Sequence, residues 1–473
     1  MKSSSTLRTL ALALASTALT FSLAVCAQAQ TVDFLYQFSG NQGNAVGVIQ
    51  GTDGNFYGSG GTGAYAKGQI FRMTPAGEVT TIYSFCAKSG CPDGTDVTTP
   101  PALGSDGYLY GVTGSGGNSS NSGTFYKMTL DGDITTLYSF CPASGCADGQ
   151  YPNGIILASD GNYYGTTELG GKHNGGTIFS ISPSGTFELL YTFCTQSNCA
   201  DGQNPLYPPV QGIDGNFYGT AYAGGAHNGG VIYQITGAGA YKVLYNFCSY
   251  QTSCPTGANP APIVQDSKGN FFGTTVLGGN SNHGTVFEFT SANQYKVLHT
   301  FLGYDGSQPG SGLTLAGDGS FYGVTQGGGG PKEGNIYKVS SAGVFKSIYV
   351  FRGNEGYDPF YGLFQGTNGS LYGTTAYGPS PCCYGMIYSV SDSIGPLVET
   401  VPVAGKVGQS VIILGNGLMG SSSVKFNGKA ATFTVESDTE IKATVPSGAT
   451  TGKVSVVTAT GTLNSSPQFV VTK

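Results

Sequence analysis

Three short phrases recur seven times along the chain, and the third phrase starts ahead of the first. The first phrase is a turn followed by aromatic residues, and its copies begin at Asp53, Asp106, Asp160, Asp214, Lys268, Asp318 and Asn368. The second, Gly-x-[Ile/Val/Phe]-[Phe/Tyr], begins at Gly68, Gly123, Gly176, Gly230, Gly284, Gly334 and Gly385. The third resembles Leu-Tyr-Ser-Phe and ends at Phe38, Phe85, Phe140, Phe193, Phe247, Phe301 and Phe351. No third phrase follows the seventh repeat, so the copy ahead of the first repeat is the one that the seventh repeat lacks. This arrangement indicates a closed ring, in which the two ends of the repeat region meet, rather than an open array.

Each repeat predicts four short strands. The first phrases are spaced 53, 54, 54, 54, 50 and 50 residues apart, within the range of propeller repeats. The third repeat predicts strands a to d over 154–158, 162–167, 176–182 and 186–193. Asp-Gly and Pro-Ser-Gly between strands favour hairpin turns, because such turns need preset or positive φ angles. We therefore expect an all-β fold, a seven-bladed β-propeller with one blade per repeat.

The displaced strand predicts how this ring closes. We expect residues 32–38 to pair with strand c of the seventh repeat, near residues 385–390. Such pairing joins the first and last repeats in one sheet and removes a free edge.

The first 29 residues have the features of a signal peptide. Lys2 and Arg8 precede an apolar run, and Ala27-Gln28-Ala29 offers a small-x-small cleavage site. A lipoprotein anchored through Cys26 is the alternative, and cleavage near residue 29 is favoured. No other stretch approaches the roughly 18–20 apolar residues of a membrane span. We expect a protein that is secreted or displayed at the bacterial cell surface, without a membrane span after cleavage.

The composition excludes one class of partner. Without Lys2 and Arg8, 18 of the 20 basic residues remain against 26 acidic ones, a net charge of −8, and only 10% of all residues are charged. A nucleic-acid binder needs a basic surface, so nucleic acid is not expected as a partner. Glycine accounts for 78 of 473 residues, but aromatic residues reach 12%, which is typical of many short strands rather than of a disordered linker.

The last part of the chain, residues 396–473, breaks the repeat. It predicts strands over 410–414, 423–426, 431–435, 440–445 and 453–459. Asn427-Gly428 is a strong hairpin signal between two of them. The expected organisation is a signal peptide over 1–29, the propeller over 30–392, and a small Ig-like β-sandwich over 396–473.

Two family resemblances follow from these residues. The motif Asp-Gly-Asn-x-Tyr-Gly-Thr-Thr-x-x-Gly-Gly, followed by Gly-Thr-Ile-Phe and Leu-Tyr-x-Phe over residues 160–193, resembles the GloVer tandem repeat of exported bacterial choice-of-anchor proteins. The resemblance covers about residues 31–390 and implies a surface or secreted protein. The tail resembles an IPT/TIG domain over residues 408–415, 424–428 and 441–446. Neither family supplies catalytic residues.

Ten cysteines remain after the signal peptide, and eight of them predict disulfides, since these persist in exported proteins. We expect pairing within each loop that follows strand d: Cys86 with Cys91, Cys141 with Cys146, Cys194 with Cys199, and Cys248 with Cys254. Zinc is the alternative, but pairs on separate blades are poorly placed to meet at one tetrahedral ion. Cys382 and Cys383 are adjacent and are expected to form either a vicinal disulfide or a reactive dithiol; a rigid loop turn is favoured there over a functional role.

The d→a and b→c connections should emerge on one face of a propeller, where loops on a rigid scaffold often carry function. His173 and His227 occupy matching positions in two b→c loops, and His283 lies nearby. They are candidates for a metal-binding or general-base role. The favoured interpretation is that they recur only because the motif is repeated, without a functional role. His299 replaces the tyrosine of strand d, and we expect it to be packed.

Two further repeated sets each have two interpretations. Aspartates before glycine in the d→a loops either form turns, which is favoured, or contribute to calcium sites; they are Asp93, Asp148, Asp201 and Asp305. Tyrosines in the first phrase either fill the space between blades, which is favoured, or stack on sugars; they are Tyr57, Tyr110, Tyr164, Tyr218, Tyr322 and Tyr372. No catalytic or nucleotide-binding motif occurs in the sequence.

The sequence therefore favours a monomeric, exported, non-enzymatic binding or adhesion protein without a cofactor. Its loop-bearing face would contact an extracellular polysaccharide or a surface protein. The alternatives are a propeller lyase or hydrolase on polysaccharide, which needs a placed acid and base, and a purely structural envelope component.

Overall fold

The computed structural model describes residues 31–39, 43–249, 254–330, 333–379 and 384–472. These residues form β-strands and connecting loops, with two 3-10 turns, η2 (Ser197–Cys199) and η3 (Gly353–Glu355). The expected all-β class is confirmed. Among the described residues, no helix has the length and apolar character needed to cross a membrane.

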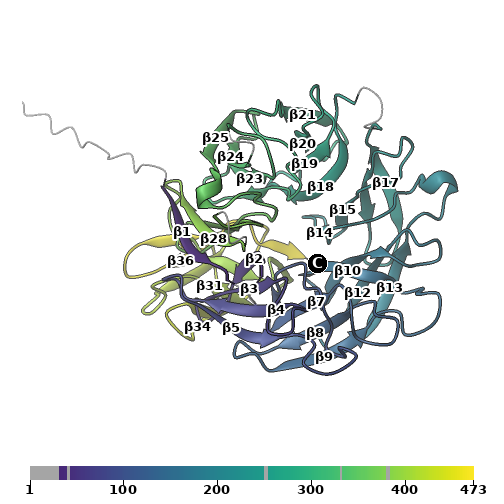
Figure 1. Cartoon of the computed structure of the whole chain (residues 1–473). Coiled ribbons are helices and arrows are strands. Elements are labelled where there is room, and N and C mark those ends of the chain that lie inside the picture. The colour runs from purple at the N-terminus through teal and green to yellow at the C-terminus, as the bar shows by residue number, and fades with distance from the viewer. Residues whose placement is uncertain (1–30, 40–42, 250–253, 331–332, 380–383, 473) are drawn as a thin grey trace, which may run out of the picture.

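Each of the first six repeats forms a four-stranded antiparallel sheet whose strands follow one another in sequence (Figure 1). The first sheet contains β2 (Ala45–Gln50), β3 (Phe56–Gly60), β4 (Gln69–Met73) and β5 (Val79–Ser84). The second contains β6 (Ala102–Leu103), β7 (Leu109–Thr113), β8 (Thr124–Met128) and β9 (Ile134–Ser139). The third contains β10 (Gln150–Leu157), β11 (Tyr163–Leu169), β12 (Thr177–Ile181) and β13 (Phe187–Thr192). The fourth contains β14 (Val210–Gln211), β15 (Phe217–Ala221), β16 (Val231–Ile235) and β17 (Tyr241–Asn246). The fifth contains β18 (Ala258–Gln265), β19 (Phe271–Leu277), β20 (Thr285–Phe289) and β21 (Tyr295–Thr300). The sixth contains β22 (Thr314–Leu315), β23 (Phe321–Thr325), β24 (Asn335–Val339) and β25 (Phe345–Val350).

The sheet of the last repeat takes its outer strand from the N-terminal end. It contains β26 (Phe364–Gln365), β27 (Leu371–Thr374), β28 (Met386–Ser391) and β1 (Thr31–Gln37). β1 pairs antiparallel with β28, so that Val32 lies opposite Val390. The predicted pairing of the displaced strand is therefore present.

The aromatic residue that ends each strand d fills the space against the next sheet. All of them are at most 1% exposed, and each packs against a ring of strand c in the following sheet: Phe85 on Tyr126, Phe140 on Phe179, Phe193 on Tyr233, Phe247 on Phe287, Phe301 on Tyr337, Phe351 on Tyr388 and Phe38 on Phe71. The glycine after the strand-b tyrosine makes room for this ring. A Cβ atom on Gly111 would collide with the ring of Tyr126, which explains why glycine ends the first phrase.

Glutamine side chains join neighbouring sheets near the centre of the repeat region. Oε1 of Gln211 accepts the backbone N–H of Ser159 at 2.9 Å, and Oε1 of Gln265 accepts that of Ile213 at 2.9 Å. Gln50 of the first sheet makes the equivalent bond to Thr367 of the last sheet at 3.0 Å. In Figure 1, these first strands lie toward the centre of the repeat region and the last strands lie at its periphery.

The C-terminal domain is a two-sheet β-sandwich. One sheet contains β29 (Glu399–Val401), β31 (Ser410–Leu414), β35 (Glu440–Thr444) and β34 (Phe433–Val435); the other contains β33 (Lys429–Ala430), β32 (Ser423–Phe426), β36 (Val454–Val457) and β37 (Thr462–Asn464). A short parallel pair, β30 (Ala404–Lys406) with β38 (Val470–Thr472), completes it. Buried side chains from both sheets, including Val411, Ile413, Val424 and Val454, form its core.

The C-terminal domain contacts the side of the repeat region that carries the Asp-Gly turns, which we call the turn face. Oγ1 of Thr439 donates to the carbonyl of Thr52 at 2.7 Å. Nδ2 of Asn416 donates to Oγ1 of Thr367 at 2.6 Å. Leu414 is buried in one cluster with Tyr57 of the first sheet. Figure 1 shows the yellow C-terminal end near the centre of the repeat region.

Candidate functional site

The cysteine loops and the glycine-rich loops lie on the same side of the repeat region, as predicted, and we call this side the loop face. Backbone N–H groups of the b→c loops donate to cysteine carbonyls of the preceding d→a loops. These bonds join Gly117 to Cys91, Gly171 to Cys146, Gly225 to Cys199 and Gly279 to Cys254, at 2.8 to 2.9 Å. The two classes of loop are thus packed together.

The four predicted disulfides are present in the structure. They join Cys86 to Cys91, Cys141 to Cys146, Cys194 to Cys199, and Cys248 to Cys254. We call their loops, which follow the first four sheets, the disulfide sector. Cys382 and Cys383 lie outside the described residues.

In the three loops of the disulfide sector that follow the first, second and third sheets, an aspartate side chain closes the loop. Oδ2 of Asp148 accepts the hydroxyl of Tyr138 at 2.7 Å and the N–H of Cys141 at 3.0 Å. Asp93 bonds Tyr83 and Cys86 in the same way. The turn-forming interpretation of these aspartates is therefore confirmed. The spacing of ten residues between the tyrosine and the aspartate was the sequence signal for this clamp, and it was overlooked.

The same clamp has one variant containing histidine. Nε2 of His299 lies 3.0 Å from Oδ2 of Asp305, which also accepts the N–H of Leu302 through Oδ1 at 2.7 Å. The imidazole stacks on Phe345 with ring centroids 3.8 Å apart. Burial lowers the pKa of His299, although the Asp305 carboxylate opposes this shift. The prediction that His299 is packed is confirmed.

His173 and His227 are exposed at the tips of their loops. The asparagine after each of them closes the loop: Oδ1 of Asn174 accepts the N–H of Gly170, and Oδ1 of Asn228 accepts that of Gly224. His283 differs, because its Nδ1 lies 2.9 Å from Oγ of Ser307. Among the described residues, no group of three or more His, Cys, Asp or Glu side chains is placed to hold a metal ion.

The tyrosines of the first phrase lie between sheets rather than on a binding surface. The hydroxyl of Tyr110 donates to Asp106 at 2.8 Å, and its ring stacks on Tyr163 of the next sheet at 4.5 Å. Tyr164 stacks on Phe217 at 3.9 Å. The packing interpretation of these tyrosines is confirmed.

Four other aromatic side chains are exposed in loops of the loop face, and sequence reasoning missed them. Tyr65 is 52% exposed, Tyr304 73%, Phe360 47% and Tyr377 40%. We call these four residues the aromatic sector. They occupy b→c loops of the first and last sheets and the d→a loops that follow β21 and β25. The sequence feature that could have identified these four residues is that none of them belongs to a recurring phrase.

Hydrogen bonds connect several loops near the aromatic sector. Oδ1 of Asn44, ahead of the first sheet, accepts the N–H of Gly385 in the last at 3.2 Å. The N–H of Asp358 donates to Glu333 at 3.0 Å, and its carbonyl accepts the N–H of Ala376 at 2.9 Å. These bonds hold the loops of neighbouring sheets together.

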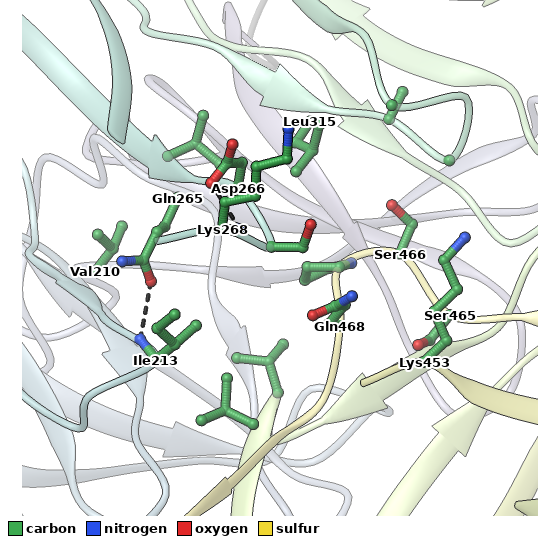
Figure 2. A pocket seen from close by; sticks show the side chains of 18 of the residues that line it. Val210, Ile213, Gln265, Asp266, Lys268, Leu315, Lys453, Ser465, Ser466 and Gln468 are labelled. Atoms are coloured by element: carbon green, nitrogen blue, oxygen red, sulfur yellow. Dashed lines mark hydrogen bonds between the residues drawn. The ribbon is translucent and has the colours of Figure 1, made fainter. Parts of the chain in front are cut away.

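A second candidate is a cavity of about 500 Å³ between the turn face and the C-terminal domain (Figure 2). Its repeat-region wall includes Ile213, Val264, Lys268 and Leu315. Its other wall comes from the C-terminal domain and includes Val403, Lys453, Ser466 and Gln468. The sequence offered no signal for this cavity, because the two walls come from separate domains.

Similarity to a solved structure supports a propeller-like fold. A catalytically inactive virginiamycin B lyase from Staphylococcus aureus, solved with quinupristin, is 15% identical, with a TM-score of 0.50 over 76% of this chain and 99% of that chain. A 6-phosphogluconolactonase described as putative, from Bacteroides uniformis, is 14% identical, with a TM-score of 0.43 over 70% of this chain and 89% of that chain. At 15% identity the likeness to the lyase concerns the fold alone. No curated protein matches the sequence.

Family models account for most of the chain. The Gloeobacter/Verrucomicrobia repeat model matches residues 15–206 and 205–401, and the IPT/TIG domain model matches residues 390–471. Both resemblances inferred from the sequence are thereby confirmed. The chain belongs to the Gloeobacter/Verrucomicrobia repeat family and carries an IPT/TIG domain at its C-terminal end.

Proposed function

We propose that the protein is an exported, non-enzymatic binding or adhesion protein, and that its aromatic sector contacts an extracellular glycan. The observation that carries the proposal is the exposure of four large aromatic side chains, 40 to 73%, on one face of a rigid scaffold. Aromatic residues are enriched in the binding surfaces of proteins. Aromatic rings offer a large contact area with few rotatable bonds, so little entropy is lost on binding.

The scaffold in this proposal is a seven-bladed propeller closed into one ring, with each four-stranded sheet as a blade. Contacts between the first and last sheets support closure. The rings of Phe56 and Tyr372 lie 4.2 Å apart, and those of Phe38 and Phe71 lie 5.4 Å apart. The C-terminal domain occupies the turn face, so the aromatic sector remains open to a large polymer.

Export agrees with the disulfides and with the signal-like residues 1–29. The sparse charge, 10% of residues, favours a neutral glycan over a highly charged polymer. A surface protein is the alternative ligand for the same loops.

One observation favours a polysaccharide-cleaving enzyme as a second candidate. Asp358 lies within the loop that carries Phe360, and its Oδ1 is buried without a partner among the described residues. Burial raises the pKa of this carboxyl, a property of general acids in glycoside hydrolysis. An Asp358→Asn variant that binds polysaccharide but stops releasing shortened chains would support this candidate.

Binding to an array of bacterial and plant polysaccharides tests the main proposal. The oxidised protein, residues 30–473, is titrated beside a Tyr304→Ala, Phe360→Ala double variant. We expect saturable binding without cleavage, weakened about tenfold in the variant, since each aromatic contact contributes about 0.5–1.5 kcal/mol. Tyr108→Ala is the matched control, because Tyr108 is an exposed aromatic residue on the turn face, 38% exposed.

Three results would overturn the proposal: no saturable binding to any polysaccharide, equal loss of affinity in the Tyr108→Ala control, or release of shortened product. The first would favour a protein ligand or a structural role. The third would favour the enzyme, and Asp358→Asn would then be assayed.

A further inference from the structure

We propose that the cavity between the turn face and the C-terminal domain binds a small ligand that carries an anionic group on an apolar body. The cavity measures about 500 Å³, within the range of about 300–1,000 Å³ typical of small-molecule sites. It lies between two domains, where such sites are common. It is separate from the aromatic sector, which lies on the loop face.

The repeat-region wall supplies the apolar surface. Ile156 and Leu157 of β10, Val210 of β14 and Phe321 of β23 line the cavity, together with Ile213 beyond β14. Gln265 bridges two of the contributing turns, because its Oε1 accepts the N–H of Ile213 at 2.9 Å and its Nε2 donates to Gly269 at 3.2 Å (Figure 2). This wall is therefore held in shape without a ligand.

The fifth repeat departs from the others at the cavity. Lys268 stands where five repeats carry Asp and one carries Asn, and Phe272 stands where they carry the tyrosine that bonds this residue. Both members of the hydrogen-bonded pair are replaced together. In the third repeat, for comparison, the hydroxyl of Tyr164 donates to Asp160 at 2.9 Å. Lys268 therefore has no structural role equivalent to that of the aspartate.

Asp266 closes this turn instead. Its Oδ1 accepts the N–H of Lys268 at 2.9 Å and that of Asn270 at 2.8 Å. These backbone donors satisfy the carboxylate, so the turn forms without the side chain of Lys268. The exposed side chain of Lys268 lines the cavity beside Asp266.

The C-terminal domain supplies a second cation. Figure 2 shows Lys453 on the wall opposite Lys268, near Ser465 and Ser466. Within the described part of the chain, neither lysine forms an ion pair. Lys268 and Lys453 are both exposed, and two unpaired ammonium groups beside an apolar wall favour a carboxylate, sulfonate or similar anion, since opposite charges attract.

Fluorescence titration with 8-anilinonaphthalene-1-sulfonate, an anionic apolar probe, tests the site in the oxidised protein, residues 30–473. We expect one saturable site from which dodecanoate displaces the probe and dodecanol does so at least tenfold less well. Lys268→Asp restores the residue of the other repeats and should weaken probe binding about tenfold. Lys242→Asp, at an exposed position of β17, is the matched control and should leave binding unchanged.

Gln468→Trp, which fills the cavity from the C-terminal domain, should also abolish binding. Absence of a saturable site, equal displacement by dodecanol, or full binding by Lys268→Asp or Gln468→Trp would overturn the proposal. The Tyr304→Ala, Phe360→Ala variant should bind the probe normally. Loss of binding in that variant would place the probe on the aromatic sector and would also overturn it.

Discussion

The disulfide sector and two members of the aromatic sector, Tyr304 and Phe360, occupy equivalent d→a loops of one repeat scaffold, but the chemistry of these loops differs. Loops after the first four sheets are closed by Cys pairs and present no exposed aromatic side chain comparable to Tyr304 among the described residues. The d→a loops after β21 and β25 carry no cysteine and expose Tyr304 and Phe360. The same loop position therefore accepts either a loop closed by a disulfide or a loop without cysteine whose aromatic side chain is available for contact.

Both sectors retain the side-chain clamp beneath the loop. Tyr138 bonds Asp148 in the disulfide sector, and His299 bonds Asp305 beside Tyr304. After β25, Tyr349 bonds Glu355. The clamp is therefore independent of the disulfide, and the following predictions separate the two contributions.

Removal of β1 should have the largest effect. A variant comprising residues 39–473 loses the outer strand of the last sheet and also Phe38, which is 1% exposed against Phe71. Loss of a buried phenylalanine alone costs about 3–5 kcal/mol, so we expect the repeat region to open and the aromatic sector to lose its arrangement. Size-exclusion chromatography and limited proteolysis measure this. A compact, protease-resistant monomer would contradict the prediction.

Removal of one disulfide should have a smaller, local effect. Cys141→Ser with Cys146→Ser should lower the free energy of unfolding by about 2 kcal/mol, the chain-entropy value for a loop of about six residues. Denaturant unfolding measures the loss, with reduced wild-type protein as a reference. Glycan binding should not change, because the aromatic sector lies on other loops. A simultaneous loss of binding would show that the two sectors are coupled.

Acidification should loosen only the histidine clamp. Because the pKa of His299 is lowered in the folded protein, its contribution to stability is present above the unfolded value of about 6.5 and is lost as pH falls below it. Burial, reinforced by Asp148, raises the pKa of Tyr138 in the disulfide sector, so the hydroxyl of Tyr138 stays protonated in this range. Hydrogen exchange of the loop after β21, corrected for intrinsic rates, should increase between pH 7.5 and 5.5.

His299→Tyr restores the residue of the other repeats and should abolish this pH dependence, with the loop after β9 as an internal control. Equal acceleration of exchange in both loops would attribute the effect to general acid destabilisation. The expected change is the smallest of the series, because only one hydrogen-bonded side chain is altered.

Local patterns predicted much of the fold. The strands over 410–414 and 423–426 match β31 and β32. The predicted strand 154–158 was too short, because β10 extends from Gln150 to Leu157 across an irregularity between Pro152 and Ile155. Five short strands of the C-terminal domain, β29, β30, β33, β37 and β38, were missed because none has more than three residues. Such segments are stabilised by their neighbours and carry little signal of their own.

The sequence by itself determined the repeat, its antiparallel sheets, the displaced strand and the local disulfides, because each depends on residues close together or on a period. Only the tertiary structure decided how far the aromatic side chains outside the recurring phrases are exposed, as for Tyr304 at 73%. It also decided that the C-terminal domain covers the turn face and forms a cavity with Lys268 and Lys453. These features depend on contacts between residues far apart in the chain, and no local pattern encodes such contacts.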